Sequence, residues 1–65
     1  MKYYKFELIE KFRRENKLGV EEFCKKCKIA MQTYYKIKNQ LLNVRASAVF
    51  KIAKVINCNM YELYY

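Results

Sequence analysis

The sequence predicts an all-α fold, a compact bundle of five helices in a single domain over residues 1–65. Three observations lead to this prediction. The chain has 65 residues, which leaves room for one small core and no second module. Hydrophobic residues make up 54% of it, which is too many for a disordered segment. One glycine and no proline argue against the turn-rich pattern of a small β-barrel.

The first helix is expected over residues 3–15, because Leu8, Ile9 and Phe12 share one face at helical spacing. Asn16 follows directly and is expected to end this helix in a left-handed conformation.

The second and third helices are short and lie close together in the chain. Gly19 is the expected N-cap of the second, which should end near residue 26 or 27. Its inner face carries Phe23, Cys24 and Cys27. Residues 28–30 break the spacing before a third helix over residues 31–38, with Tyr34 and Ile37 inward. Two short helices joined so tightly must cross steeply, which is the helix-turn-helix geometry.

A fourth helix is expected over residues 46–56, with Asn43 or Ser47 as its N-cap. Its buried stripe is Val49, Ile52, Ala53 and Ile56. Asn59 and Glu62 have the spacing of a capping box and predict a final short helix through Leu63.

Positive charge is concentrated in the second half of the chain. The net charge is +8, and residues 23–61 contain eight basic residues and no acidic one. Such a field suits a polyanion such as nucleic acid, and suits an acidic membrane or protein surface less well. The alternative is that the charge serves solubility alone.

Enzyme chemistry is not expected, because the chain has no His and no Asp from which to build an acid–base pair. We therefore expect no catalytic residue, no cofactor and no small-molecule substrate. Cys24, Cys27 and Cys58 are too few for a structural zinc site, so we expect no metal and interpret all three as buried hydrophobic residues. No signal peptide or membrane-spanning run is evident, which favours a soluble cytoplasmic protein.

The outward face of the third helix carries side chains that suit DNA. Gln32 can pair with adenine, Met31 can contact a thymine methyl group, and Tyr35 and Lys36 can reach phosphates. Each residue alone could equally belong to a solvated helix surface.

Three segments of the chain resemble the phage-repressor family of Cro/C1-type helix-turn-helix domains, which includes the lambda-type repressors and Cro. They read EKFRRENKLGVEEFC, KCKIAMQTYYKIKNQ and VFKIAKVINCNMYEL, within a match that extends from Ile9 to Leu63. The resemblance implies a lambda-repressor-like fold and a sequence-specific DNA-binding transcriptional regulator, a bacterial or phage repressor, whose third helix enters the major groove. It places base contacts on Met31, Gln32, Tyr35 and Lys36. Together with the neighbouring cations, the expected phosphate contacts are Lys28, Lys38, Asn39, Asn43 and Arg45.

The chain departs from the family pattern at five positions. Val20 replaces a phosphate-gripping Gln, and Ala30 replaces the Ser or Thr that caps the recognition helix. Lys28 stands at the usual glycine of the turn, where a left-handed backbone would cost on the order of 1 kcal/mol. Gln40 replaces a frequent glycine, and Val44 a frequent proline.

One recognition helix reads only a few base pairs, so we expect a homodimer on double-stranded DNA, using the surface of residues 60–65. The alternative role for that aromatic tail is closure of the core. Two other functions remain open: a protein-interaction module that binds an acidic partner through the same surface, and a nonspecific nucleic-acid binder.

Overall fold

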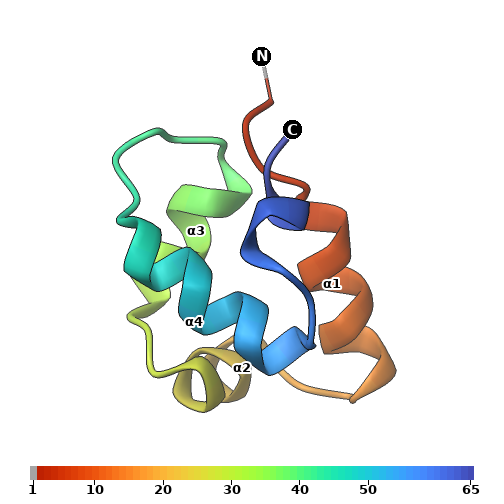
Figure 1. Ribbon diagram of the computed structural model, residues 1–65. Helices are drawn as coiled ribbons and strands as arrows, with labels where there is room; N and C mark the ends of the chain where they lie inside the picture. The colour runs from red at the N-terminus through yellow and green to blue at the C-terminus, as the bar shows by residue number, and fades with distance from the viewer. Residues whose placement is uncertain (1) are drawn as a thin grey trace.

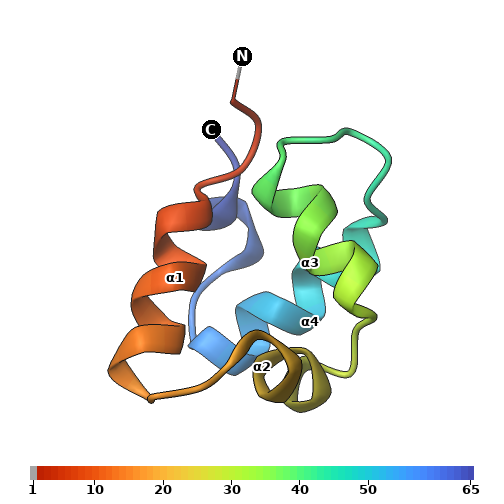
Figure 2. The ribbon, with the colours of Figure 1, turned by 180° about the vertical axis from the view of Figure 1, so that it is seen from behind.

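A computed structural model describes residues 2–65. Its elements are α1 (Phe6–Glu15), α2 (Val20–Cys27), α3 (Met31–Lys38), α4 (Ala46–Ile56) and a terminal 3-10 helix, η1 (Met60–Leu63) (Figure 1). Figures 1 and 2 show α1 and α3 on opposite sides of the molecule, with α4 between them and α2 at one end. The all-helical prediction is confirmed for these residues. The count of five helices is not, because the last element is a single 3-10 turn.

The core draws on every element. Its buried residues are Tyr4, Ile9, Phe23, Cys24, Cys27, Tyr34, Ile37, Val49, Ile52, Ala53 and Leu63. The rings of Phe23 and Tyr34 meet edge to face with centroids 6.0 Å apart, and Phe6 packs on Tyr34 at 5.2 Å. Full burial of one such side chain stabilises a fold by roughly 1.5–3 kcal/mol. The inward faces predicted for the four α-helices therefore meet in one core. Within residues 2–65, no helix is both long and apolar enough to cross a bilayer.

The three cysteines are free thiols, as predicted, and pack as small hydrophobic side chains. Cys24 and Cys27 are buried, whereas the prediction of a buried Cys58 is wrong, because Cys58 is only half-buried. Burial raises the pKa of each thiol, and raises the pKa of Cys27 from 9.0 to about 11. The thiols are therefore neutral at physiological pH. Across residues 2–65 the structure shows no group of three side chains placed to ligate a metal.

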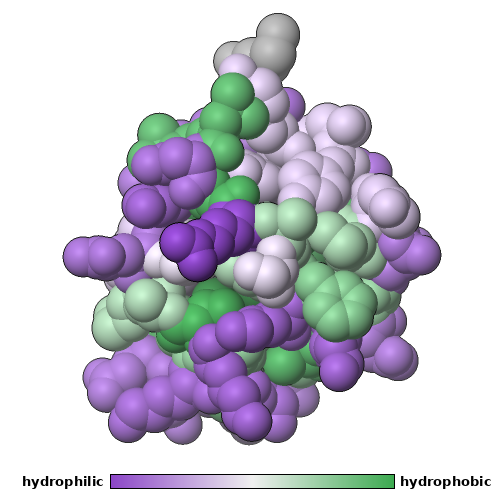
Figure 3. All heavy atoms as spheres, turned by 60° about the vertical axis from the view of Figure 1, so that its left-hand side comes forward, coloured by the Kyte–Doolittle hydropathy of each residue, from purple (hydrophilic) through white to green (hydrophobic). Residues whose placement is uncertain are grey.

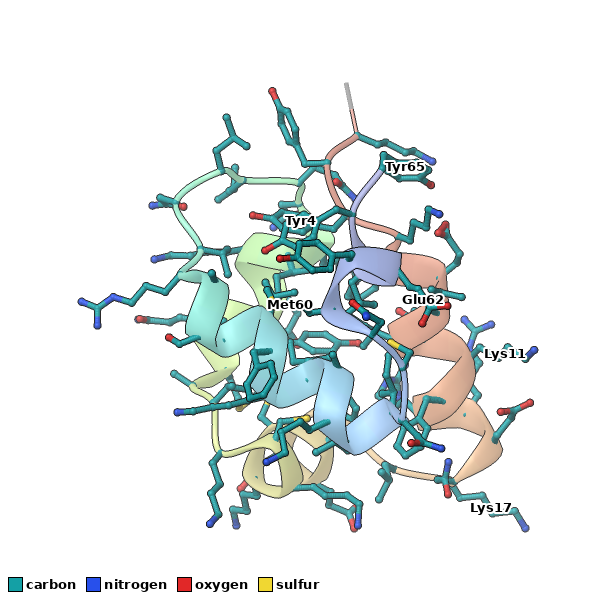
Figure 4. All side chains as sticks on the ribbon, viewed as in Figure 1. Tyr4, Lys11, Lys17, Met60, Glu62 and Tyr65 are labelled. Carbon is teal, nitrogen blue, oxygen red and sulfur yellow. The ribbon has the colours of Figure 1, made fainter. Side chains whose placement is uncertain are left out.

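The predicted start of the first helix at residue 3 is wrong, because α1 begins at Phe6. The preceding residues are extended and pair with the C-terminal end of the chain. Tyr4 forms an antiparallel bridge with Tyr64, and the flanking bonds are Lys5 N to Leu63 O at 2.8 Å and Tyr65 N to Tyr3 O at 3.1 Å. The pairing buries the Tyr4 side chain beside Tyr64, whose ring centroid is 5.6 Å away (Figure 4). It holds the two ends of the fold together.

Gln40 secures the other side of this N-terminal segment. Its Oε1 accepts hydrogen bonds from Tyr3 N at 2.7 Å and Tyr4 N at 2.8 Å, and its Nε2 donates to Tyr4 O at 3.0 Å. One amide side chain therefore satisfies three backbone groups that lie 36 or 37 residues away in sequence. This contact ties the N-terminal segment to the end of α3.

Each of the four α-helices is followed by a left-handed residue that is not glycine: Lys17, Lys28, Gln40 and Asn57. The expectation that Asn16 takes this conformation is wrong, because Asn16 has φ −100° and the left-handed residue is Lys17, at φ 53°. The C-terminal bonds explain the shift. Leu18 N donates to Arg13 O at 2.9 Å and Lys17 N to Arg14 O at 3.1 Å, which is a Schellman motif with Lys17 after the cap.

The helix N-termini confirm two of the predicted caps and correct a third. Gly19 is the N-cap of α2, and its N–H donates to Glu22 Oε1 at 3.3 Å. Asn59 caps η1: its Oδ1 accepts from Tyr61 N at 2.9 Å, and its N–H donates to Glu62 Oε2 at 2.8 Å.

The N-cap of α4 is neither Asn43 nor Ser47 but Arg45, which makes no side-chain cap bond. The Arg45 carbonyl accepts from Ala48 N at 3.0 Å, and this first helical bond sets the start of α4 without a capping side chain.

Candidate nucleic-acid interface

Helices α2 and α3 form the predicted helix-turn-helix. The break between them is real: Lys28 is left-handed at φ 59° and ψ 46°, and Ala30 is extended at φ −74° and ψ 150°. Met31–Lys38 is therefore a new helix and not the continuation of a long one. Tyr34 and Ile37 anchor it, each with 2% of its surface exposed.

The opposite side of α3 is open to solvent along its length. Met31 and Tyr35 are each 41% exposed, and Gln32 is also exposed. The Tyr35 ring packs edge-on against Tyr34, with centroids 5.4 Å apart, and Lys38 Nζ lies 5.9 Å from its centroid. These contacts restrain the Tyr35 ring, so α3 presents a partly ordered polar face.

A polar cleft of about 290 Å³ opens beside this face, between the α2–α3 turn, α3 and the N-terminal part of α4. Its polar lining is Lys28, Thr33, Lys36, Asn43, Arg45, Ser47 and Lys51. We call it the cationic cleft, after the four cations Lys28, Lys36, Arg45 and Lys51. Figure 3 turns this side of the molecule forward and shows hydrophilic side chains over much of its lower half.

No acidic side chain neutralises the cationic cleft. Its lining contains none, and the ion pairs within residues 2–65 all lie on α1 and α2. They join Glu10 to Arg13 at 2.9 Å and to Arg14 at 3.6 Å, and Glu21 to Lys25 at 3.4 Å. Four uncompensated cations around one concave surface concentrate a positive potential there, which favours an anionic ligand.

The cations of the α1 side lie elsewhere. Lys11 and Lys17 extend from α1 and the turn after it (Figure 4), and Lys11 lines a groove that also includes Lys38 at the end of α3. They share that region with Glu7, Glu10 and Glu15, so its charge is mixed. The structure thus separates a mixed face from a cationic one.

The structure brings together four of the nine predicted contact residues, because Lys28, Lys36, Asn43 and Arg45 line the cationic cleft. Three others, Met31, Gln32 and Tyr35, are exposed along α3.

The remaining two lie apart from the cleft. Asn39 is exposed at the C-terminal cap of α3. Lys38 lines a different groove, together with Lys2, Glu7 and Lys11. Contact of any of the nine residues with nucleic acid stays a prediction.

Sequence reasoning missed three residues of the cleft: Thr33, Ser47 and Lys51. Helical spacing gave a signal for each of them. Ser47 and Lys51 are four residues apart on α4 and lie outside its buried stripe, so they share an outward face. Thr33 precedes Lys36 by three residues on α3, which places the two side chains on one side of that helix.

Comparison with known families gives one finding. The model of the Cro/C1-type HTH DNA-binding domain matches residues 9–65, most of the chain, from within α1 to beyond η1. No curated protein and no solved structure matches the chain.

Proposed function

We propose that this chain, which belongs to the family of Cro/C1-type helix-turn-helix DNA-binding domains, is a sequence-specific transcriptional repressor that inserts α3 into the major groove. The observation that carries the proposal is the exposed polar face of α3 beside a cleft with four cations and no acid. In this arrangement one surface holds the DNA backbone while the helix beside it reads base edges. Occupying a promoter-proximal site in the cytoplasm then blocks transcription.

Different residues of α3 contact different groups on the bases. The Gln32 amide pairs with N6 and N7 of adenine, and Met31 contacts the methyl group of a neighbouring thymine. Tyr35 and Lys36 complete the α3 contacts. A well-placed bidentate pair such as that of Gln32 contributes about 1–3 kcal/mol of discrimination against the wrong base.

The phosphate contacts flank these residues. Lys28, Asn43 and Arg45 hold the backbone at the cleft, and Lys38 and Asn39 hold it at the C-terminal end of α3. Because phosphate contacts carry no sequence information, they set affinity and orientation and leave specificity to α3.

One recognition helix contacts only a few base pairs, and a homodimer on double-stranded DNA places two such helices on two half-sites. The surface that supports it is narrower than residues 60–65, since Tyr64 packs on Tyr4. Phe50 and Tyr61 are 51% and 76% exposed, and with Met60 they line a hollow of about 280 Å³ between α4 and η1. Exposed aromatic side chains around such a hollow favour a protein contact.

Selection from a random duplex library at moderate salt tests the proposal. An enriched palindrome is expected, since a two-fold dimer reads two equal half-sites. Gln32→Ala should weaken binding to the selected duplex by about 5–150-fold, the equivalent of about 1–3 kcal/mol. Lys17→Ala, in the turn after α1, is the control and should bind as the wild type does, because Lys17 is exposed and lines neither the cationic cleft nor the groove of Lys38. Binding without enrichment would make the chain a nonspecific nucleic-acid binder.

A second candidate function uses the same surface for an acidic protein partner. The observations that favour it lie at two helix starts. Ala30, the N-cap of α3, makes no side-chain cap bond, and Val20, the first residue of α2, offers no polar group for a phosphate. A Gln32→Ala/Lys36→Ala double variant separates the two functions. Loss of duplex binding supports the DNA contact, and full retention would remove this face of α3 from the interface.

A further inference from the structure

The cationic cleft gathers its charges from three separate parts of the chain. Lys28 comes from the α2–α3 turn and Lys36 from α3, while Arg45 is the N-cap of α4 and Lys51 lies in the middle of that helix. The hydroxyl groups of Thr33 and Ser47 stand among them and can donate hydrogen bonds to an anion. Lys51 lies outside the helix-turn-helix, so the cleft is a property of the folded domain and not of that motif alone.

The lining also excludes some ligands. It contains no aromatic side chain, so a nucleobase would find no ring on which to stack. It contains no carboxylate, so a cation would find no counter-charge. Cations and hydroxyl groups around a small concave surface suit a phosphate group.

The side chain of Lys36 belongs to this cleft rather than to the base-reading face. Lys36 is half-buried and follows Thr33 by three residues, so the two line the cleft from the same side of α3. Gln32 and Met31 are exposed and are not part of the lining.

We propose that the cationic cleft binds adjacent phosphates of the DNA backbone, with Lys51 as a contact outside the helix-turn-helix and with Lys36 facing a phosphate instead of a base edge. This inference rests on the proposed function for the source of the phosphate. It changes the set of side chains that are expected to contact bases, because it leaves Met31, Gln32 and Tyr35 as the base-contacting residues of α3.

The salt dependence of duplex binding measures the contact. Each neutralised phosphate contributes about 0.9 to the slope of log K against log salt. Lys51→Gln and Lys36→Gln should each reduce the slope by about 1, on selected and random duplexes alike. Between about 50 and 200 mM salt, each variant should therefore lose about 3.5-fold less affinity than the wild type does.

Lys17→Gln is the control. Lys17 is exposed in the turn after α1 and lines neither the cationic cleft nor the hollow between α4 and η1. Its substitution should leave the slope unchanged. The proposal is overturned if Lys51→Gln and Lys17→Gln have the same slope. The assignment of Lys36 is overturned if Lys36→Gln keeps the wild-type slope and changes the base enriched at one position.

Inorganic pyrophosphate distinguishes a failure of this inference from a failure of the proposed function. Titrated into the wild-type protein, it should shift the backbone amide resonances of Thr33, Ser47 and Lys51 saturably, and Lys51→Gln should weaken the effect. If no duplex binds but pyrophosphate shifts these resonances, the cleft is a phosphate site and the DNA proposal is wrong. If duplexes bind but pyrophosphate leaves these resonances unchanged, the cleft proposal is wrong and the DNA proposal stands.

Discussion

Substitution of Gln40 tests how the N-terminal segment is held to the end of α3. Gln40→Ala removes all three hydrogen bonds to Tyr3 and Tyr4 while keeping a side chain on a left-handed backbone at φ 60°. A net contribution of about 1 kcal/mol per bond gives an upper value of about 3 kcal/mol. All three bonds are only partly buried, so water replaces some of them, and we expect a loss of about 2 kcal/mol.

Gln40→Gly separates the amide from the backbone strain. It loses the same three bonds but relieves about 1 kcal/mol of left-handed strain, so its net loss should be about 1 kcal/mol. The expected order of stability is therefore wild type, then Gln40→Gly, then Gln40→Ala.

Urea denaturation measures the free energies of unfolding, and thermal melting should place Gln40→Ala about 8–16 °C below the wild type. Hydrogen exchange adds a local readout, because the amides of Tyr3 and Tyr4 should lose protection in both variants. Gln32→Ala, in an exposed α3 side chain, is the control and should change stability by less than about 0.5 kcal/mol. The reasoning is refuted if Gln40→Ala is as stable as the wild type, or if Gln40→Gly is the less stable of the two variants.

Three further predictions concern the turn and the core. Lys28→Gly should raise the free energy of unfolding by about 1 kcal/mol, because it relieves a left-handed residue at φ 59°; an unchanged urea midpoint would contradict this. Ala30→Ser should add about 1 kcal/mol by capping α3, and Ala30→Val, which cannot cap, should not. The Cys27 pKa is raised to about 11 in the fold, so the thiol ionises first in the unfolded chain, and stability present below about pH 8 should fall as the pH rises from about 9 to 11. Urea titrations should show a smaller fall over that range for Cys27→Ala, and an equal fall would remove Cys27 as the cause.

The parts of the fold that depend on residues close together in the sequence could be predicted, and the parts that depend on distant residues could not. The bounds of α3 and α4 agree with the prediction, because each helix has apolar residues at helical spacing and is followed by an Asn, Asn39 or Asn57. The start of α1 could not be predicted in this way. Tyr4 is an aromatic residue and is compatible with the buried face of a helix. Its extended conformation depends on Tyr64 and Gln40, which are distant in sequence. The hydrogen bonds of Gln40 to Tyr3 and Tyr4 could not be predicted either, because they also join residues that are distant in sequence.

The candidate site likewise has one part that helical spacing predicted and one part that depends on long-range packing. Helical spacing alone identified the outward face of α3, since Tyr34 and Ile37 determine which side is buried. The cationic cleft needed the packing of α4 against the α2–α3 turn, so Lys51 could be placed on an exposed face but not beside Lys36. Long-range packing is therefore what the sequence pattern did not supply.

Because the two ends of the fold are paired, the same elements could be connected in a different order along the chain. Tyr3 and Tyr65 are joined by a hydrogen bond of 3.1 Å, so a short glycine linker could connect the two ends. The loop at Leu41 and Leu42 is exposed and offers a place for new termini. Such a circular permutant would run from α4 through the linker to α3, with Lys51 near its new beginning and Lys36 near its new end. It would present the same cationic cleft from a chain in which the two helices that shape it are no longer consecutive.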